Sequence, residues 1–278
     1  MSAPEDRRWI VVGIDGSPRA LDAVRWAAAE AARRGAGLRL VTAVEGPDRP
    51  MLGFPVEAML EPVGRDVEDA AAVAAEVAPP VPLDRKVEVG HPVAVLVAES
   101  RRVELLVVGA SGFGRIAAAL AGSVAIGAAT HAACPVVVVR GERPDGTAPV
   151  VLGVDASPVG EGAIAFAFEA AAARGVPLVA VRTSGGRRRG ERSAPQWGEL
   201  DGWTERHPGV DVRRIVGHDH PAHRLLELSG EAQLVVVGSR GHGELVGLIL
   251  DSVSHAMVHG AACPVAVVRP RGPAEEVR

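Results

Sequence analysis

Two stretches of this 278-residue chain return in a second copy, and this internal repeat constrains the fold more than any other feature of the sequence. Residues 9–18 (WIVVGIDGSP) reappear as residues 150–158 (VVLGVDASP), so Asp15 corresponds to Asp155, an offset of 155 − 15 = 140. Residues 133–140 (ACPVVVVR) reappear as residues 262–269 (ACPVAVVR), an offset of 262 − 133 = 129. A repeat this long predicts two similar domains rather than a solenoid.

The two copies differ in length and are joined by a polar segment. Residues 142–149 read ERPDGTAP, a composition that is typical of a linker. We therefore expect a first domain over residues 1–142, a linker over 143–149 and a second domain over 150–278. The second copy is 140 − 129 = 11 residues shorter, and we place the loss between its second and third strands.

Short apolar runs alternate with helical patterns in each copy. In the first copy, the segments expected as strands are Ile10–Ile14, Leu38–Val44, Val87–Val89, Leu105–Val108 and Val136–Val139. The expected helices are Pro18–Arg34, Asp66–Ala78, Pro92–Ser100 and Val124–Ala133, whereas residues 56–64 are ambiguous. This alternation predicts an α/β fold with two tandem, doubly wound domains, each built on a five-stranded parallel sheet. Right-handed crossovers then bring the loops after the first and fourth strands to one crevice, so we expect Asp15 and Gly109 to face it.

A glycine-rich stretch follows the fourth strand. Residues 109–123 read GASGFGRIAAALAGS, with Gly109 and Gly112 near the strand and Gly122 before the next helix. Glycine permits positive φ and lets a ligand approach the backbone. Ser123 is a favourable N-cap for the helix, and the free N–H groups at a helix start attract anions. The spacing predicts a phosphate cradle.

Composition narrows the range of functions. The formal net charge of −4 and an aromatic content of 3% argue against a nucleic-acid-binding surface. Two cysteines do not make a disulfide framework, and the first residues lack the pattern of a signal peptide, so we expect a cytoplasmic protein. Residues 116–139 carry no formal charge, but glycine, histidine and proline interrupt them and we do not expect a membrane span.

Several other groups of residues have a structural interpretation and a functional one. His218, His220 and His223 could ligate a metal, although a polar strand-to-helix loop explains them more simply. Asp251, His255 and His259 share one helix face at i, i+4 spacing, which is also compatible with a metal. We expect no metal site and no catalytic constellation. The basic run at residues 184–193 (SGGRRRGERS) is interpreted as a solvated loop, and Cys134 and Cys263 as small buried apolar residues.

Taken together, these motifs resemble the universal stress protein family. The features that carry the resemblance are VVGIDGSP, GASG followed after nine residues by GS, and the terminal ACPVVVVR, and they cover nearly the whole chain twice. The resemblance implies a tandem member with the adenine-nucleotide alpha-hydrolase-like fold. One branch of the family binds ATP through G-x2-G-x9-G-[ST], so ATP is the implied ligand, with or without Mg²⁺.

The resemblance also implies roles for individual residues in the first copy. Asp15 would lie beside the ribose and phosphates, and Ala43 would meet adenine through its backbone. The backbone N–H groups that would hold the phosphates belong to Gly109, Gly112, Gly122, Ser123 and Val124. An alternative role for Asp15 is to open the helix at Pro18 as a cap or turn residue.

The second copy departs from the motif at one position. The corresponding site residues are Asp155, Gly238, Arg240, Gly241, Ser252 and Val253, but Asp251 replaces the last glycine. Its carboxylate would lie near the phosphates, where like charges cost about 1 to 4 kcal/mol. Asp is also a preferred N-cap and would occupy the N–H groups that a phosphate needs. Against this, Arg240 or a bridging Mg²⁺ would offset its charge. We expect nucleotide to be held mainly by the first domain.

These expectations lead to three hypotheses about function. The first is an ATP-binding regulatory protein of the stress response that changes its surface for an unknown protein partner when nucleotide binds. The second is a slow adenine-nucleotide hydrolase or transferase that uses the same crevice, and the third is a nucleotide-free scaffold. Uncharged closing strands in both copies also suggest an intramolecular pseudo-dimer, with a homodimer as a further option.

Overall fold

The computed structural model of the protein describes residues 8–45, 56–110, 122–141, 146–154, 160–183, 197–217, 219–239 and 250–269. The chain divides into two compact units, Met1–Val139 (unit 1) and Arg140–Arg278 (unit 2). Each unit is an α/β domain with its own parallel sheet, as the repeat predicts.

Unit 1 has five parallel strands in the order β3-β2-β1-β4-β5. The strands are β1 (Trp9–Ile14), β2 (Gly37–Val44), β3 (Leu83–Val89), β4 (Leu105–Gly109) and β5 (Val136–Val139). The helices are α1 (Pro18–Arg34), α2 (Val56–Val77), α3 (Pro92–Glu99), extended by the 3₁₀ turn Ser100–Arg102, and α4 (Ser123–His131). The order reverses between β1 and β4, and ligands of doubly wound sheets bind at such a switch point.

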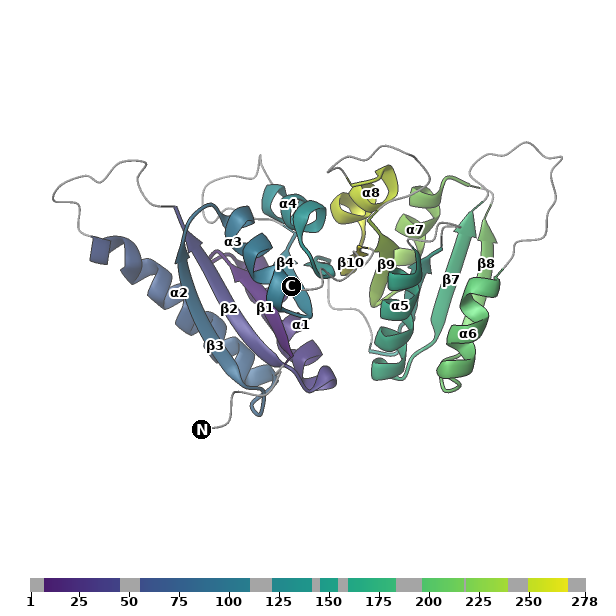
Figure 1. The fold of residues 1–278 in the computed structure, drawn as a ribbon, viewed down its shortest axis with the longest axis horizontal. Helices are drawn as coiled ribbons and strands as arrows, with labels where there is room; N and C mark the ends of the chain where they lie inside the picture. Colours follow the sequence, from purple (N-terminus) through teal and green to yellow (C-terminus); the bar gives the residue numbers. More distant parts are fainter. Residues whose placement is uncertain are drawn as a thin grey trace, which may run out of the picture. The chain divides into compact units, whose positions relative to one another are not determined.

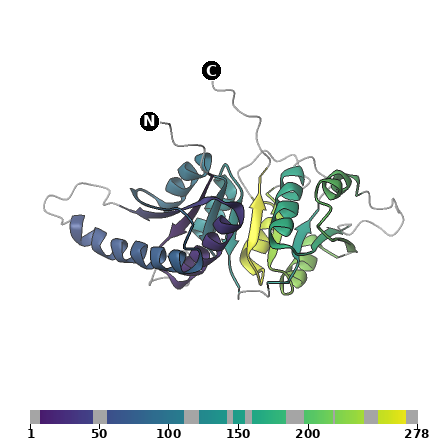
Figure 2. The same ribbon diagram turned by 90° about the horizontal axis from the view of Figure 1, so that it is seen from below.

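The helices cover both faces of this sheet. The chain moves outward from β1 to β3 through α1 and α2, then crosses back to β4 through α3 and on to β5 through α4 (Figure 1). Right-handed crossovers in opposite directions place the two helix pairs on opposite faces. Accordingly α1 packs against α2, and α3 packs against α4. The long helix α2 is seen from another side in Figure 2.

The sequence explains why the first helix begins and ends where it does. Ser17 is the N-cap of α1, and its Oγ accepts a hydrogen bond of 3.1 Å from the N–H of Ala20. Pro18 occupies the first turn, where a missing N–H has no cost. Gly35 ends the helix with φ 62°, the left-handed conformation that glycine adopts at least cost. Alanines on the buried face let α1 approach the sheet closely.

In unit 1 the structure resolves one ambiguous segment and corrects the length of one predicted strand. Residues 56–64, which were ambiguous, are helical, because α2 runs from Val56 through Pro62 to Val77. The third strand is longer than Val87–Val89 and begins at Leu83, which is followed by three consecutive charged residues. Pairing with Leu38–Val44 of β2 holds this edge strand in place, and the local sequence gives little sign of it.

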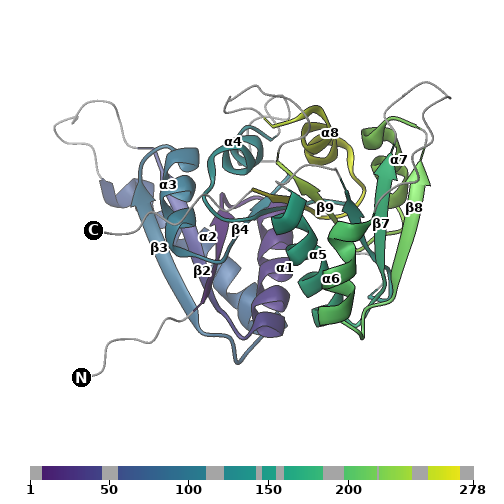
Figure 3. The same cartoon turned by 45° about the vertical axis from the view of Figure 1, so that its right-hand side comes forward.

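Unit 2 repeats the topology with a smaller second connection. Its strands are β6 (Val150–Gly153), β7 (Leu178–Thr183), β8 (Val212–Gly217), β9 (Leu234–Gly238) and β10 (Val265–Val268), in the order β10-β9-β6-β7-β8. Its helices are α5 (Glu161–Arg174), α6 (Gly198–Arg206), α7 (Pro221–Ser229) and α8 (Ser252–Gly260). Helix α6, which packs against α5 (Figure 3), has 9 residues where α2 has 22. The second copy is therefore shorter between its second and third strands, as the sequence predicts.

Candidate nucleotide site

A cavity of about 260 Å³ lies at the carboxyl edge of the unit 1 sheet. The ends of β1, β2 and β4 form its floor, and side chains of α2, α3 and α4 complete its wall. Four residues that the family resemblance assigns to ATP line it, namely Asp15, Ala43, Gly109 and Val124. The fold therefore brings together residues that are separated by more than one hundred positions in the chain.

Asp15 supports the turn that joins β1 to α1. Its Oδ1 accepts a hydrogen bond of 3.0 Å from the N–H of Ser17, which in turn caps α1. Asp15 is therefore a turn residue that orients Ser17, whereas Ser17 itself is the N-cap of α1. Asp15 is exposed and lines the cavity, so the two roles are compatible.

A second carboxylate, which no sequence motif singles out, packs against the same turn. Gly16 has φ 72°, and a Cβ added there would lie 2.3 Å from Oδ2 of Asp66 on α2. Asp66 and Glu45 line the cavity together with Asp15, and its described lining contains no lysine or arginine. Negative charge is thus gathered on this part of the lining, and an uncharged part is its edge at Gly109 and Val124.

That edge is formed by the end of β4 and the start of α4. A Cβ at Gly109 would lie 2.9 Å from the carbonyl oxygen of Arg19, so packing against α1 by itself requires glycine there. Gly122 is the N-cap of α4 and has φ 106°. The prediction of Ser123 as the N-cap was wrong, because glycine takes the left-handed position and Ser123 becomes the first helical residue.

The first turn of α4 presents backbone donors. The carbonyl of Gly122 accepts from the N–H of Ile126 at 2.7 Å, which closes this turn. The N–H groups at the first positions of a helix have no partner within the helix. Ser123 is exposed, and Val124 lines the cavity. Gly112, the remaining residue assigned to the phosphates, lies outside the described residues.

The corresponding helix start in unit 2 is built differently. Asp251 is the N-cap of α8 with φ −65°, and its Oδ1 accepts a hydrogen bond of 2.7 Å from the N–H of Ser254. The expected capping by Asp251 is confirmed. Gly238 ends β9, and Ser252 and Val253 begin α8, so these residues keep the places of their counterparts. Asp155, Arg240 and Gly241 lie outside the described residues.

A further difference between the units lies at the second strand. In unit 1, Gly13 of β1 pairs with Val41 of β2, and Thr42 is the next residue of β2. In unit 2, Gly153 of β6 pairs with Val181 of β7 in the same way, and Arg182 is the next residue of β7. This register makes Arg182 the counterpart of Thr42. Arg182 forms an ion pair with Glu199 of α6, and its guanidinium carbon lies 5.2 Å from the centroid of a Trp197 ring. Unit 2 thus carries a long cationic side chain where unit 1 has a short hydroxyl.

The histidines have structural roles in the described part of the chain. His220 caps α7, with its Nδ1 3.3 Å from the N–H of Ala222, while His218 lies outside the described residues. The rings of His255 and His259 are in contact, with 4.5 Å between their centroids and an angle of 50° between their planes. No group of three or more potential metal ligands occurs among the residues described, so nothing there supports a Mg²⁺ site.

The cysteines are buried, as expected. Burial raises the pKa of both the Cys134 and the Cys263 thiol to about 12.

Within the described ranges, no helix combines the length and apolar character that crossing a bilayer requires. The basic run at residues 184–193 lies outside those ranges.

Comparison with known proteins connects this architecture to a family. The sequence model of the universal stress protein family matches the chain twice, at residues 7–140 and 147–269. Universal stress proteins of Mycobacterium tuberculosis and Mycobacterium bovis are each 38% identical over 297 residues, which cover 97% of this chain and 99% of the relative. A universal stress protein of Mycolicibacterium smegmatis is 35% identical over 285 residues, 94% of this chain and 97% of its own.

A solved structure with the same fold covers both units. The crystal structure of a universal stress protein from Archaeoglobus fulgidus matches with a TM-score of 0.76 and 17% identity, over 97% of this chain and 100% of that one. At this identity the likeness concerns the fold alone.

Proposed function

Since the chain belongs to the universal stress protein family, we propose that it is a nucleotide-binding regulatory protein and that unit 1 holds ATP. The observation that carries this proposal is the cavity of about 260 Å³ lined by Asp15, Ala43, Gly109 and Val124. These residues come from four separate segments and meet where the strand order reverses, the place at which doubly wound sheets bind ligands.

The distribution of charge favours one orientation of ATP. Adenine would lie against the end of β2 near the backbone of Ala43, and the ribose hydroxyls would donate to the carboxylate of Asp15. The phosphates would lie at Gly109 and at the start of α4, away from the carboxylates of Glu45 and Asp66. A helix N-terminus stabilises an anion by about 0.3–1 kcal/mol, and by up to about 2 kcal/mol when partly buried.

Unit 2 is proposed to bind ATP weakly or not at all. The carboxylate of Asp251 occupies the N–H of Ser254, which is one of the donors that a phosphate would use. Its negative charge would also oppose a phosphate by about 1–4 kcal/mol, depending on solvent exposure. Arg182, held by Glu199, stands where the adenine-binding edge of unit 1 has Thr42.

The decisive measurement is the amount of nucleotide per chain, by denaturing extraction after saturation with ATP. We expect about one ATP per chain in the wild type. Gly122→Asp should weaken binding in unit 1 at least tenfold, because a carboxylate enters and the φ of 106° is strained for a non-glycine residue. Asp251→Gly should raise the stoichiometry above one.

A matched control separates these effects from a general change in charge. Asp211→Asn removes an exposed carboxylate next to the amino end of β8, at the opposite edge of the sheet from the site. It should leave the stoichiometry unchanged. Two tightly bound nucleotides in the wild type, or no effect of Asp251→Gly, would refute the proposed asymmetry.

The regulatory part of the proposal has its own test. Differential affinity of two conformations for ATP would shift their populations and alter the surface presented to a protein partner. A pull-down with and without ATP should therefore recover different partners. Sustained ATP turnover that Asp15→Ala abolishes would instead indicate a slow hydrolase or transferase, and no binding at millimolar ATP would leave a nucleotide-free scaffold.

A further inference from the structure

Among the residues that the structure describes, the hydroxyl of Thr42 is buried without a hydrogen-bond partner, and Thr42 lines the unit 1 cavity. Thr42 is 6% exposed and lies near the end of β2, between Ile14 of β1 and Val87 of β3. Its Oγ1 has no partner within the described part of the chain, although Thr42 lines the same cavity as Asp15 and Ala43. Thr130 of unit 1 is also buried, but its hydroxyl is hydrogen-bonded, since its Oγ1 donates to the carbonyl of Ile126 at 2.7 Å.

An unpaired buried hydroxyl has a cost that folding alone does not explain. Leaving such a group without a partner destabilises a protein, and most buried polar side chains are paired. Valine has nearly the same shape and would avoid this cost. A threonine at this position therefore points to a partner that joins the cavity from outside the chain.

The neighbouring residue indicates which part of a ligand the hydroxyl would meet. Ala43 is the adjacent position on β2, and its backbone is assigned to adenine, whereas the backbone donors for the phosphates belong to β4 and α4. A hydroxyl both donates and accepts, so it can pair with either kind of group on the edge of a base. Rotation about χ1 between staggered wells changes the direction of the hydroxyl without moving the backbone of the strand.

We propose that Thr42 is a ligand-binding residue whose hydroxyl forms a hydrogen bond with the base of the nucleotide in unit 1. This inference rests on the proposed binding of ATP in unit 1 and adds a side-chain contact to it. Arg182 takes the corresponding position in unit 2 and is paired with Glu199. The contact is therefore specific to unit 1 and adds to the asymmetry between the units.

The test uses the full-length chain and three substitutions. Thr42→Val removes the hydroxyl and keeps the shape, Thr42→Ser keeps the hydroxyl, and Thr130→Val is the control that removes a paired hydroxyl. Calorimetric titration gives Kd for ATP and for adenosine, and thermal unfolding without ligand gives Tm. We expect Thr42→Val to raise Kd about 2- to 12-fold, the equivalent of one neutral hydrogen bond.

Two features of the result identify the contact. The loss should be equal for ATP and adenosine, because both carry the base and only one carries phosphates. In the absence of ligand, Thr42→Val should raise Tm by about 2–4 °C, since the unpaired hydroxyl is gone. Thr42→Ser should retain wild-type affinity, and Thr130→Val should leave Kd unchanged without raising Tm.

Each other outcome counts against a particular part of the inference. Equal affinity of Thr42→Val and the wild type would overturn the role of Thr42 and leave ATP binding intact. A loss for ATP but not for adenosine would overturn the assignment to the base, and a Thr42→Val chain that fails to fold would mean that the hydroxyl is structural. A wild-type chain that binds neither ligand would overturn the proposed function and this inference together.

Discussion

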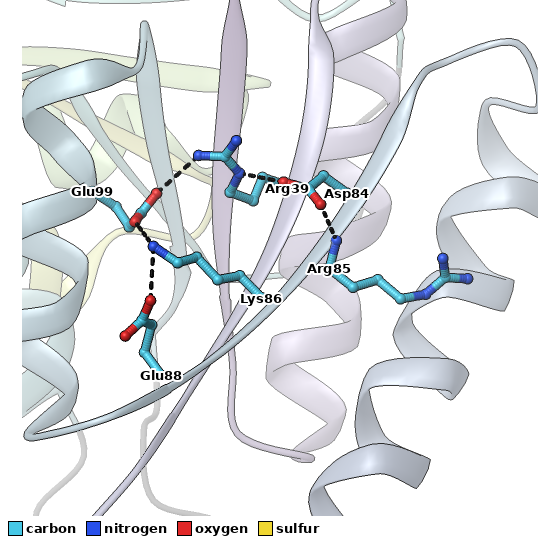
Figure 4. Close-up of polar contacts among 6 residues, drawn as sticks. All are labelled: Arg39, Asp84, Arg85, Lys86, Glu88 and Glu99. Atoms are coloured by element: carbon cyan, nitrogen blue, oxygen red, sulfur yellow. Dashed lines mark hydrogen bonds and ion pairs between the residues drawn. The ribbon is translucent and has the colours of Figure 1, made fainter.

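A network of charged side chains on β2, β3 and α3 of unit 1 allows the size of one effect on stability to be predicted from the structure. Figure 4 shows Arg39 of β2 between Asp84 and Glu99, and Lys86 of β3 between Glu99 and Glu88. The distances are 2.7 Å for Arg39–Asp84, 3.2 Å for Arg39–Glu99, 2.7 Å for Lys86–Glu99 and 2.8 Å for Lys86–Glu88. Glu99 therefore ties the end of α3 to two strands at once.

The perturbation is Glu99→Gln, and Glu88→Gln is its matched control. The Glu99 side chain is 11% exposed and accepts two charge-assisted bonds, each worth about 1.5–3 kcal/mol when well desolvated. Lys86 is 37% exposed, and both cations keep another partner, so we expect a smaller loss of about 1–2 kcal/mol. Glu88 is 41% exposed, and its replacement should cost under about 0.5 kcal/mol.

The assay is chemical unfolding as a function of pH. Burial opposes ionisation of Glu99, but the hydrogen bonds and charges of Lys86 and Arg39 outweigh it and hold its pKa below the ordinary value of 4.5. A carboxyl with a lowered folded-state pKa contributes stability above 4.5 that is lost as the pH falls through the folded-state value. Since glutamine cannot ionise, the difference between wild type and Glu99→Gln should be full at pH 7 and should disappear in acid.

Two results would refute this reasoning. A difference that stays constant from pH 7 into acid would mean that the charge of Glu99 is not responsible. Equal losses for Glu99→Gln and Glu88→Gln at pH 7 would mean that burial does not decide the strength of these pairs.

Three further predictions concern the turn at Gly16, the unit 2 site and the cysteines. Gly16→Ala should destabilise unit 1 by about 1–3 kcal/mol, because of the φ of 72° and the 2.3 Å approach to Asp66. Adding Asp66→Ala should recover part of this loss in a double-mutant cycle of urea unfolding, which strictly additive effects would contradict. Arg182→Thr together with Asp251→Gly should give a higher ATP stoichiometry than Asp251→Gly alone by calorimetric titration, and equal values would show that Arg182 does not obstruct the site. Because burial raises the pKa of both cysteine thiols to about 12, a disulfide reagent at pH 8 should modify them only after denaturation, and modification at the same rate in folded protein would contradict this.

The sequence alone determined the architecture and predicted which edge of the sheet carries the candidate site. The repeat defined two similar domains, and uncharged runs such as Val136–Val139 predicted strands buried on both faces. Asp15 and Gly109 could be assigned to one crevice because parallel strands joined by right-handed crossovers place their carboxyl ends at the same edge. Capping by Asp251 was also predictable, because a cap depends on residues only three positions apart.

The tertiary structure decided the features that depend on distant contacts. Pairing with β2 sets the length of β3, and packing on the turn brings Asp66 beside Gly16. Gly122 rather than Ser123 caps α4, because the cap is chosen by the backbone angles that the approaching chain requires. Thr42 appears in the sequence as one more strand residue, and only the fold shows that its hydroxyl is buried without a partner among the described residues. Periodicity and local capping are properties of neighbouring residues, whereas burial and pairing depend on residues that folding brings together from far along the chain.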